Sequence, residues 1–331
     1  MTDSNASDGV VVNPGARVSK WADDFMFKAE PLKASDGPQV YLLAGTPDPL
    51  GAISAMAKMY KGQVVRNIAL DVTDEERRDY MREILKTKLK APMEAVKMHF
   101  MIEGVTRSYT HQMVRQRTAV YAQESLRFAV KEDMATGVAY PPSILSAKDD
   151  DPQRVIWDDA VNAVSAAYLA LIESGMPAED ARGLLPHNIT TRLNYVTDLR
   201  ALQDHGGNRL CTQAQYEWRI VWVRIIAALR AYCTCQMSAD GEVFHGDHCD
   251  NWQWGAIADI FRPVCYLTGK CEFMADFDRK CSIRDRVEAN HHVGRPSIEW
   301  DQEAVADIGG RVQTIQAIHP AEWLLDAGAA R

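Results

Sequence analysis

The stretch that decides how this sequence is interpreted is Arg115-Gln116-Arg117-Thr118-Ala119-Val120-Tyr121-Ala122-Gln123-Glu124-Ser125, which is followed at once by Leu126-Arg127-Phe128. Two arginines, seven spacers and a serine stand together here. Arginine suits phosphate because its planar fork donates two hydrogen bonds and keeps its charge. A single arginine on a helix is more often solvated or paired with an acid. The joint placement with Ser125 and Gln112 therefore carries the interpretation, which is an anion-binding site.

More arginines precede and follow this run. Arg107 comes before it, and a second group lies further along the chain at Arg182, Arg192, Arg200, Arg209 and Arg219. A site that holds several phosphates needs several fixed guanidinium groups. We therefore interpret the run as one part of a larger anion-binding site.

The length and composition describe a folded protein with a sizeable core. The chain has 331 residues, 47% of them hydrophobic, enough for one large domain or two smaller ones. No stretch approaches roughly 20 uninterrupted apolar residues, and the N-terminus lacks a basic start before an apolar block. Seven unevenly spaced cysteines favour reduced thiols. We expect a soluble cytoplasmic protein without a membrane partner.

The net charge of -8 is unevenly distributed. Residues 236–331 hold 16 acidic and 9 basic residues, whereas residues 1–235 hold 29 acidic and 28 basic residues. Nucleic-acid-binding domains usually carry a basic patch or stripe. We therefore expect no nucleic-acid partner.

Periodicity and capping signals predict the order of the elements. The expected strands are 40–43, 96–102 and 189–197, and the expected helices are 50–60, 74–89, 107–117, 198–205 and 213–233. Thr73 with Glu76 is a capping-box pattern, and Gly206-Gly207 is expected to end the helix before it. The run from Arg115 to Ser125, called the arginine-serine run below, then lies at a helix end and in the loop that follows.

Several short motifs occur in one order between about Val40 and Cys235. They are Thr46-Pro47-Asp48-Pro49, Asp74-Glu75-Glu76-Arg77, Ala91-Pro92-Met93-Glu94, Leu185-Pro186-His187-Asn188, Asp198-Leu199-Arg200-Ala201-Leu202, Asn208-Arg209 and Gln213-Ala214-Gln215-Tyr216-Glu217. Together with the arginine-serine run, this order resembles the flavin-dependent thymidylate synthases, whose signature is Arg-His-Arg-x7-Ser. The resemblance implies an α+β fold with a mostly antiparallel sheet flanked by helices. It also implies a homotetramer with active sites at subunit interfaces.

The resemblance divides the chain into three parts. Residues 1–37 are an N-terminal arm, 38–235 the synthase-like catalytic domain, and 236–331 an acidic C-terminal extension that contains Cys and Trp. The implied activity is reductive methylation of dUMP to dTMP, with FAD as cofactor and with NADPH and methylenetetrahydrofolate as co-substrates. Two alternatives stay open: methylation or hydroxymethylation of another pyrimidine nucleotide such as dCMP, and a catalytically silent protein that binds flavin or nucleotide.

The resemblance also assigns residues to the two ligands. The implied dUMP-binding residues are Gln112, Arg115, Gln123, Glu124, Ser125, Arg127, Arg182 and Arg209, of which Arg209 and Ser125 are the implied catalytic residues. The implied FAD-binding residues are Glu94, Arg115, Gln116, Arg117, Gln123, Asp198, Arg200 and Asp204. Arg209 would lie beside the pyrimidine ring, where its charge stabilises negative charge at N3 and O4. The family builds its active site at a subunit interface, so the resemblance allows Arg182 to reach the same nucleotide from another subunit.

Four positions depart from the family pattern, one of them Ala91, which lacks the hydroxyl of the threonine that is usual there. Gln116 replaces a histidine, so it keeps hydrogen bonding but loses a titratable ring. Asp198 and Asp204 stand where asparagines are usual, which adds negative charge near a flavin. Cys211 is close to Arg209, but no histidine or acid pattern of an activated thiol surrounds it.

The cysteines and histidines near the end of the catalytic region raise the question of a metal. Cys233, Cys235, His245, His248 and Cys249 offer ligands that zinc prefers, in a spacing that fits no common zinc pattern. Reduced, mostly buried cysteines are the favoured interpretation, and we predict no bound metal.

Overall fold

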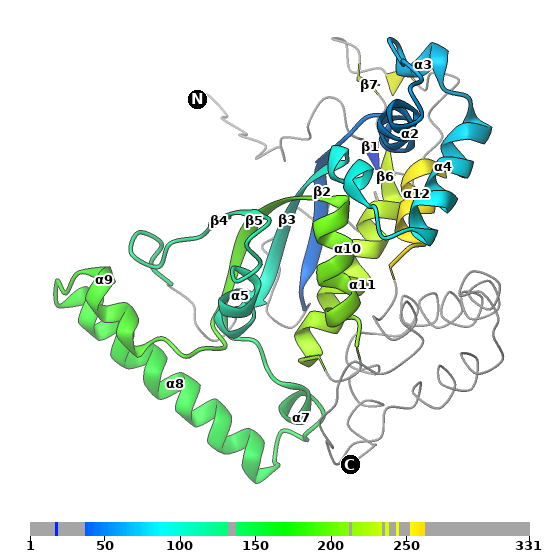
Figure 1. Cartoon of the computed structure of the whole chain (residues 1–331). Helices are drawn as coiled ribbons and strands as arrows, with labels where there is room; N and C mark the ends of the chain where they lie inside the picture. The colour runs from blue at the N-terminus through cyan, green and yellow to red at the C-terminus, as the bar shows by residue number, and fades with distance from the viewer. Residues whose placement is uncertain are drawn as a thin grey trace.

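A four-stranded antiparallel sheet forms the centre of the molecule (Figure 1). The structure is a computed structural model that describes residues 37–131, 137–211, 214–233 and 252–261, with short strands at 17–18, 236–237 and 243–244. The strands are β2 (Gln39–Gly45), β3 (Lys97–Thr106), β5 (Thr190–Asp198) and β4 (Val120–Gln123), in the order β2-β3-β5-β4. All three pairings are antiparallel. The predicted α+β class with a mostly antiparallel sheet is confirmed.

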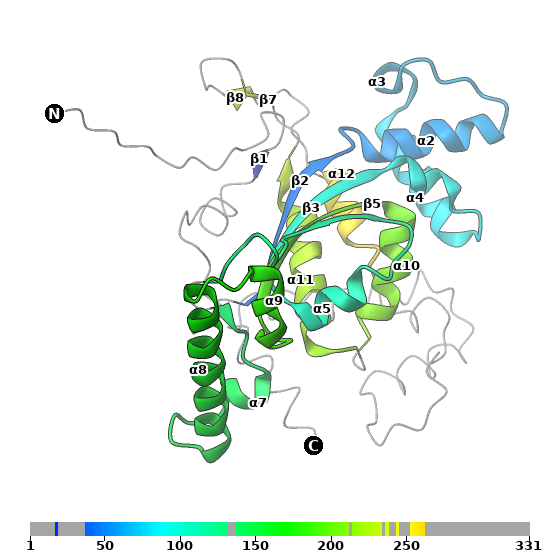
Figure 2. The same cartoon turned by 90° about the vertical axis from the view of Figure 1, so that its left-hand side faces the viewer.

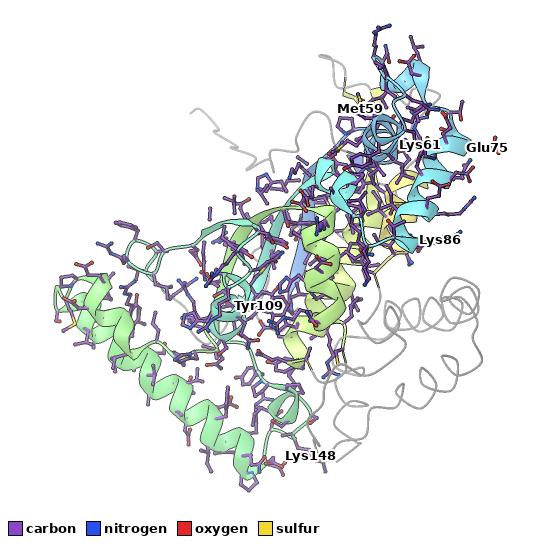
Figure 3. All side chains as sticks on the ribbon, viewed as in Figure 1. Met59, Lys61, Glu75, Lys86, Tyr109 and Lys148 are labelled. Carbon is purple, nitrogen blue, oxygen red and sulfur yellow. The ribbon has the colours of Figure 1, made fainter. Side chains whose placement is uncertain are left out.

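One face of the sheet carries the hydrophobic core. Alternate residues of a strand point to opposite faces, and the register pairs Phe100 with Tyr195 and Ile102 with Leu193, all four of them buried. Helices α5 (Arg107–Met113), α10 (Leu199–Arg209) and α11 (Tyr216–Ala231) lie on one side of the sheet (Figure 2). Figure 3 places Tyr109 of α5 in the middle of the molecule, whereas Lys61 and Lys86 project outward. The sheet and these helices therefore bury one continuous core.

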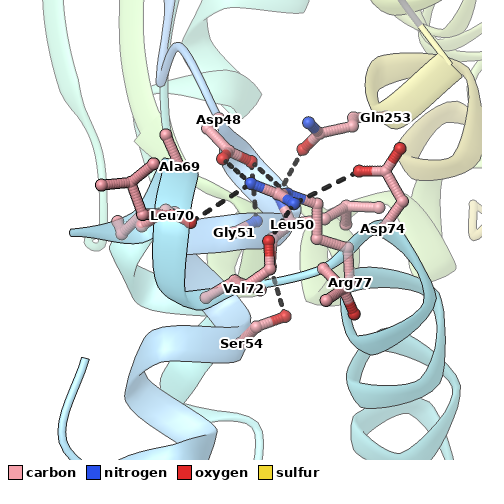
Figure 4. Close-up of polar contacts among 12 residues, drawn as sticks. Asp48, Leu50, Gly51, Ser54, Ala69, Leu70, Val72, Asp74, Arg77 and Gln253 are labelled. Atoms are coloured by element: carbon pink, nitrogen blue, oxygen red, sulfur yellow. Dashed lines mark hydrogen bonds and ion pairs between the residues drawn. The ribbon is translucent and has the colours of Figure 1, made fainter. Parts of the chain in front are cut away.

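Helices α2 (Pro49–Tyr60), α3 (Ile68–Asp71) and α4 (Asp74–Lys86) are joined by a buried arginine. Thr73 and Glu76 form the predicted capping box at the start of α4. Arg77 of α4 is 7% exposed and donates to both carboxylate oxygens of Asp48, at 2.6 and 3.1 Å, and to Val72 O at 2.6 Å (Figure 4). Asp48 in turn caps α2 through Gly51 N. The arginine therefore holds two helix N-termini in one arrangement.

Helix α12 (Trp252–Ala258) packs into the same core although it lies far along the chain. Gln253 Oε1 accepts from Leu50 N at 2.9 Å, and the buried Trp254 ring contacts Tyr232 at 5.3 Å between centroids. A Cβ on Gly45 would lie 2.5 Å from the Trp254 ring, so this position requires a glycine. Part of the region after residue 235 thus packs against the sheet and its helices, while the division into three parts stays a prediction.

A second, smaller cluster lies beyond the edge strand β4. Helices α7 (Pro142–Leu145), α8 (Pro152–Glu173) and α9 (Ala178–Ala181) extend away from the sheet, followed by the 3-10 turn η3 (Arg182–Leu184). Tyr168 is fully buried there with Leu126, Ala181 and Ile189. The sequence patterns did not predict α8. Its length and apolar composition alone would allow it to cross a membrane, with a mean hydropathy of 1.4, which is weak evidence for a span.

The short elements complete the described part of the chain. The 3-10 helix η2 (Ala91–Ala95) precedes β3, β1 (Arg17–Val18) pairs with β6 (Tyr232–Cys233), and β7 (Gln236–Met237) pairs with β8 (Val243–Phe244).

Several predicted helix bounds are wrong, and one predicted loop is a strand. The helix that begins at Asp74 ends at Lys86 instead of Leu89. The helix from Arg107 ends at Met113, so the arginine-serine run begins in a turn, and its residues 120–123 are strand β4 instead of a loop. The helix after β5 continues through Gly206 to Arg209. The long helix begins at Tyr216 and ends at Ala231, before β6.

The continuation of α10 through its glycines has a packing reason. A Cβ on Gly206 would lie 2.8 Å from the ring of Trp222 on α11. The glycine therefore permits close contact between two helices instead of ending one, at the usual cost of about 1 kcal/mol in helix propensity.

Candidate functional site

A cavity of about 650 Å³ opens where the end of α5, the following turn, η2 and α10 meet. Eleven residues line it: Glu94, Gln112, Arg115, Gln116, Thr118, Asp198, Arg200, Ala201, Asp204, His205 and Arg209. Eight of them are among the predicted site residues. Thr118, Ala201 and His205 were not predicted. The spacing of His205 and Arg209, four residues apart on one helix, is the signal that could have identified His205.

The charges of this lining are balanced. Three arginines and three carboxylates face the cavity, which is of a size typical for small-molecule and cofactor sites. Cavities of this kind bind ligands that combine phosphates with a polar ring, because guanidinium groups take the phosphates and the carboxylates accept from ring N–H groups.

The amide of Gln116 is fixed on both sides. Its Nε2 donates to Ala201 O at 3.2 Å, and its Oε1 accepts from the hydroxyl of the buried Tyr195 at 2.9 Å. The Tyr121 hydroxyl, stacked beside Tyr195, also donates to Gln116 O at 3.3 Å. A neutral histidine likewise offers one donor and one acceptor. The glutamine therefore supplies both hydrogen-bonding functions without a group that titrates.

Gln112 is held by the neighbouring helix α11. The indole N–H of Trp218 donates to Gln112 Oε1 at 2.9 Å, and Gln112 Nε2 donates to Gln215 Oε1. Trp218 is only 1% exposed. The side chain of Gln112 thus lines the cavity in an orientation that α11 determines.

Arg209 closes one side of the cavity. Its guanidinium lies over the Trp218 ring, 4.5 Å from the centroid, and its Nε donates to His205 Nε2 at 3.4 Å. Burial lowers the pKa of Arg209. No ion pair joins Arg209 to any acid within the described residues. Its charge is therefore available to a ligand.

The carboxylates at the rim have partners of their own. Arg200 donates to Glu94 at 2.6 Å, and both side chains are partly exposed. Asp198 caps α10 by accepting from Ala201 N at 2.9 Å, and it lies 3.3 Å from the ammonium group of Lys97. The extra negative charge of Asp198 is thus offset by a lysine and used in a helix cap.

The rest of the arginine-serine run lies outside the cavity. Arg117, Gln123, Glu124, Ser125, Arg127 and Arg182 are absent from its lining. Arg127 Nε contacts Glu179 Oε2 at 2.9 Å, and Ser125 Oγ accepts from Arg127 N at 3.3 Å. The η3 turn that begins with Arg182 follows α9, which lies apart from α10 in Figure 1.

Glu124 and Gln123 are engaged within the fold. Glu124 accepts from Lys131 Nζ at 2.9 Å, and its main-chain carbonyl accepts from Arg107 Nη2 at 2.9 Å. Burial opposes ionisation of Glu124, but the contacts with Lys131 and Arg192 outweigh it and lower its pKa. Gln123 Nε2 donates to Thr110 Oγ1 at 2.9 Å. These contacts join the run to α5 and β5.

The metal and thiol candidates carry no site within the described residues. Cys235, His245, His248 and Cys249 lie outside them, as does the side chain of Cys233. The described part of the chain holds no group of three or more His, Cys, Asp or Glu residues able to bind a metal. Cys211 is partly buried and is not in the cavity lining.

The chain is similar in sequence to known proteins. The family described as "Thymidylate synthase complementing protein" matches residues 41–233. A flavin-dependent thymidylate synthase of Geobacter sulfurreducens is 28% identical over 193 residues, covering 58% of this chain and 82% of that protein. A flavin-dependent thymidylate synthase of Saccharolobus solfataricus is 34% identical over 223 residues, covering 65% of this chain and 84% of that protein. A crystal structure of the flavin-dependent thymidylate synthase from Helicobacter pylori with FAD and dUMP has a TM-score of 0.43 and 16% identity, over 57% of this chain and 93% of that one.

The match spans more than half of the chain, and it includes all of the sheet except the first two residues of β2, together with α10, α11 and every residue that lines the cavity. The chain belongs to the family of flavin-dependent thymidylate synthases.

Proposed function

We propose that this protein catalyses the reductive methylation of dUMP to dTMP, with FAD as cofactor and with methylenetetrahydrofolate and NADPH as co-substrates. The observation that carries the proposal is the cavity, which gathers eight residues that the family resemblance assigns to flavin and nucleotide. The curated relatives with this name share 28–34% identity with the chain over most of their own length. A cytoplasmic location belongs to the same proposal.

The residues present fit a flavin dinucleotide. Arg115 and Arg200 face the cavity and suit a pyrophosphate. Asp198 offers carboxylate oxygens beside them, and Gln116 has a second Nε2–H besides the one that bonds Ala201 O. The proposed FAD-binding set also keeps Glu94, Asp204, Arg117 and Gln123. When bound, the reduced flavin supplies the hydride and relays the one-carbon unit.

The chain's own contribution is positioning and charge. Arg209 would place a fixed cation beside N3 and O4 of the pyrimidine, where it stabilises the negative charge that accompanies attack from C5. Gln112, held by Trp218, would orient the same nucleotide. No protein thiol takes part in this scheme.

The nucleotide phosphate would be bound by a second group, Gln123, Glu124, Ser125, Arg127 and Arg182, supplied by another copy of the chain. Support comes from the absence of these residues from the cavity lining and from large apolar side chains that are exposed in the single chain. Phe128, next to Arg127, is 81% exposed, and Ile156 on α8 is 69% exposed. We propose a homotetramer, as in the family, with α8 at a subunit interface.

The test is tritium release from [5-³H]dUMP by the purified yellow protein, with NADPH and methylenetetrahydrofolate present. We expect tritium release that requires the protein, dUMP, NADPH and methylenetetrahydrofolate, and we expect dTMP as the product. Release from [5-³H]dCMP but not from dUMP would contradict the proposed substrate. Arg209→Ala should keep its flavin and lose most turnover, whereas Arg82→Ala, an exposed change on α4, should retain both.

A further inference from the structure

Two residues that were not among the predicted site residues, His205 and Trp218, contact the side chains of the proposed nucleotide site. Trp218 contacts two cavity residues at once, because its ring carries the Arg209 guanidinium and its N–H donates to Gln112. His205 contacts the same ring edge-on, with centroids 4.9 Å apart and planes at 77°. These four side chains therefore form one connected group.

Each contact limits a different freedom of Arg209. The quadrupole of an indole ring attracts a cation that lies over its face within about 6 Å. This attraction holds the Arg209 guanidinium over Trp218 but does not determine how the guanidinium is rotated in its own plane. The Nε contact to His205 fixes that rotation. At 3.4 Å this hydrogen bond is long and weak on its own. The Trp218 ring and the His205 imidazole therefore orient Arg209 together. The two Nη groups are then the donors left for a ligand.

His205 is suited to accept this hydrogen bond. Burial, with a further contribution from the Arg209 charge, lowers its pKa to about 4. The imidazole is therefore neutral near pH 7 and has one lone pair to offer. Its position is fixed by edge-on contacts with Trp218 and, at 6.1 Å, with Trp222.

We propose that His205 and Trp218 are positioning residues that hold Arg209 in one orientation toward the pyrimidine of the bound nucleotide. A carboxylate in place of His205 would neutralise the arginine, whereas a neutral imidazole orients it and leaves its charge for the ligand. The inference rests on the proposed function, since it takes dUMP as the ligand. It goes beyond that function in naming what gives the arginine its geometry.

The test measures dUMP affinity by calorimetry on the flavin-loaded protein and compares three forms. His205→Phe keeps the aromatic volume and removes the acceptor, and it should weaken dUMP binding roughly tenfold with flavin content unchanged. His205→Gln places a carbonyl oxygen near the position of Nε2 and should restore affinity to within about threefold of wild type. Equal affinity of wild type and His205→Phe would overturn the proposal, as would a His205→Gln variant as weak as His205→Phe.

A double-mutant cycle separates positioning from general damage. Lysine has no Nε–H of the guanidinium kind, so His205→Phe should weaken dUMP binding no further in an Arg209→Lys background. Additive losses would show that His205 acts independently of Arg209 and would contradict the proposal.

A readout without nucleotide distinguishes this inference from the proposed function. In protein labelled with [¹⁵N]arginine, the Arg209 Nε–H signal, identified by its loss in Arg209→Lys, should be protected from exchange in wild type and exposed in His205→Phe. That result together with no dUMP binding by wild type would support the positioning and refute the proposed substrate. Identical exchange in both proteins would overturn the positioning itself.

Discussion

The buried carboxylate of Glu217 should make the stability of this protein depend on pH. Glu217 lies on α11 and is 2% exposed. Its two oxygens accept from Thr106 N and Thr106 Oγ1, both at 2.6 Å. Thr106 is also the N-cap of α5, which carries Gln112. Burial raises the pKa of Glu217 to about 7, although both hydrogen bonds from Thr106 act to lower it.

The size of the effect follows from the two pKa values. The usual value is 4.5, so the folded state binds the proton more tightly than the unfolded chain does. The stabilisation that protonation gives is therefore complete below pH 4.5 and is lost as the pH rises to about 7. At about 1.4 kcal/mol per pKa unit, the total change is on the order of 3 kcal/mol.

The measurement is urea unfolding of wild type and Glu217→Gln between pH 4.5 and 8 at one protein concentration, because self-association would shift apparent stability. Other groups titrate in both proteins, so the difference between the two free energies of unfolding isolates Glu217. We expect wild type to lose roughly 3 kcal/mol relative to the variant across this range. A difference that stays constant with pH would refute the reasoning.

Three further substitutions test packing and polar contacts through the free energy of unfolding in urea. Gln116→Leu removes one of the two side-chain partners of the buried Tyr195 hydroxyl, the other being Thr197, and should cost about 1 kcal/mol, most of which Gln116→His should recover; equal losses in both variants would contradict this account. Arg77→Met should cost about 3 kcal/mol because it leaves a partly buried carboxylate unpaired, whereas Arg82→Met, which removes an exposed pair on the same helix, should stay within about 0.5 kcal/mol. Gly206→Ala should cost about 1 kcal/mol net, because its methyl group meets a tryptophan ring on α11 while about 1 kcal/mol of helix propensity is regained. A gain in stability would show that the two helices separate easily.

Local signals predicted the elements whose ends are determined by local contacts. The capping box at Thr73 and Glu76 starts α4 as the sequence indicates, since both of its hydrogen bonds lie within one turn. Alternation identified β3 and β5 because one face of each strand packs against the core. In such segments the sequence period and the tertiary environment agree.

The secondary-structure predictions were wrong where a contact between residues far apart in the sequence determines the local structure. Residues 120–123 form a strand only because β5 is beside them, and only four residues take part. Gly206 is a helix-ending signal locally, yet Trp222 needs the space that a missing Cβ leaves. Helix α8 has a weak apolar period because much of its surface is exposed. No local pattern contains this information.

The site was predicted through family motifs more than through chemistry. Gln112 and Arg209 lie 97 residues apart, and Arg115 lies between them in the sequence. The β3-β5 pairing and the hydrogen bond from Gln116 to Ala201 of α10 bring all three to one cavity. The contacts of Trp218 with Arg209 and Gln112 could not be predicted, because a tryptophan in an apolar helix is interpreted as a core residue. Trp218 is indeed buried in the core as well. A residue that packs and positions at once gives no separate signal in a sequence.

The run at 115–128 divides into residues that the fold already uses and residues that remain available. Glu124 is paired with Lys131, both largely buried. Removing Lys131 would leave Glu124 with only the longer contacts to Arg192 and Thr191, and removing Glu124 would leave the Lys131 charge without this partner. Arg127 contacts Glu179 with both side chains about half exposed, and such a pair contributes roughly 0–1 kcal/mol. A phosphate can therefore replace Glu179 at Arg127 at little cost, whereas it cannot displace the partners of Glu124. Within the proposed phosphate-binding group, we therefore expect Ser125 and Arg127 to contact the phosphate, while Glu124 holds the segment after β4 that carries them.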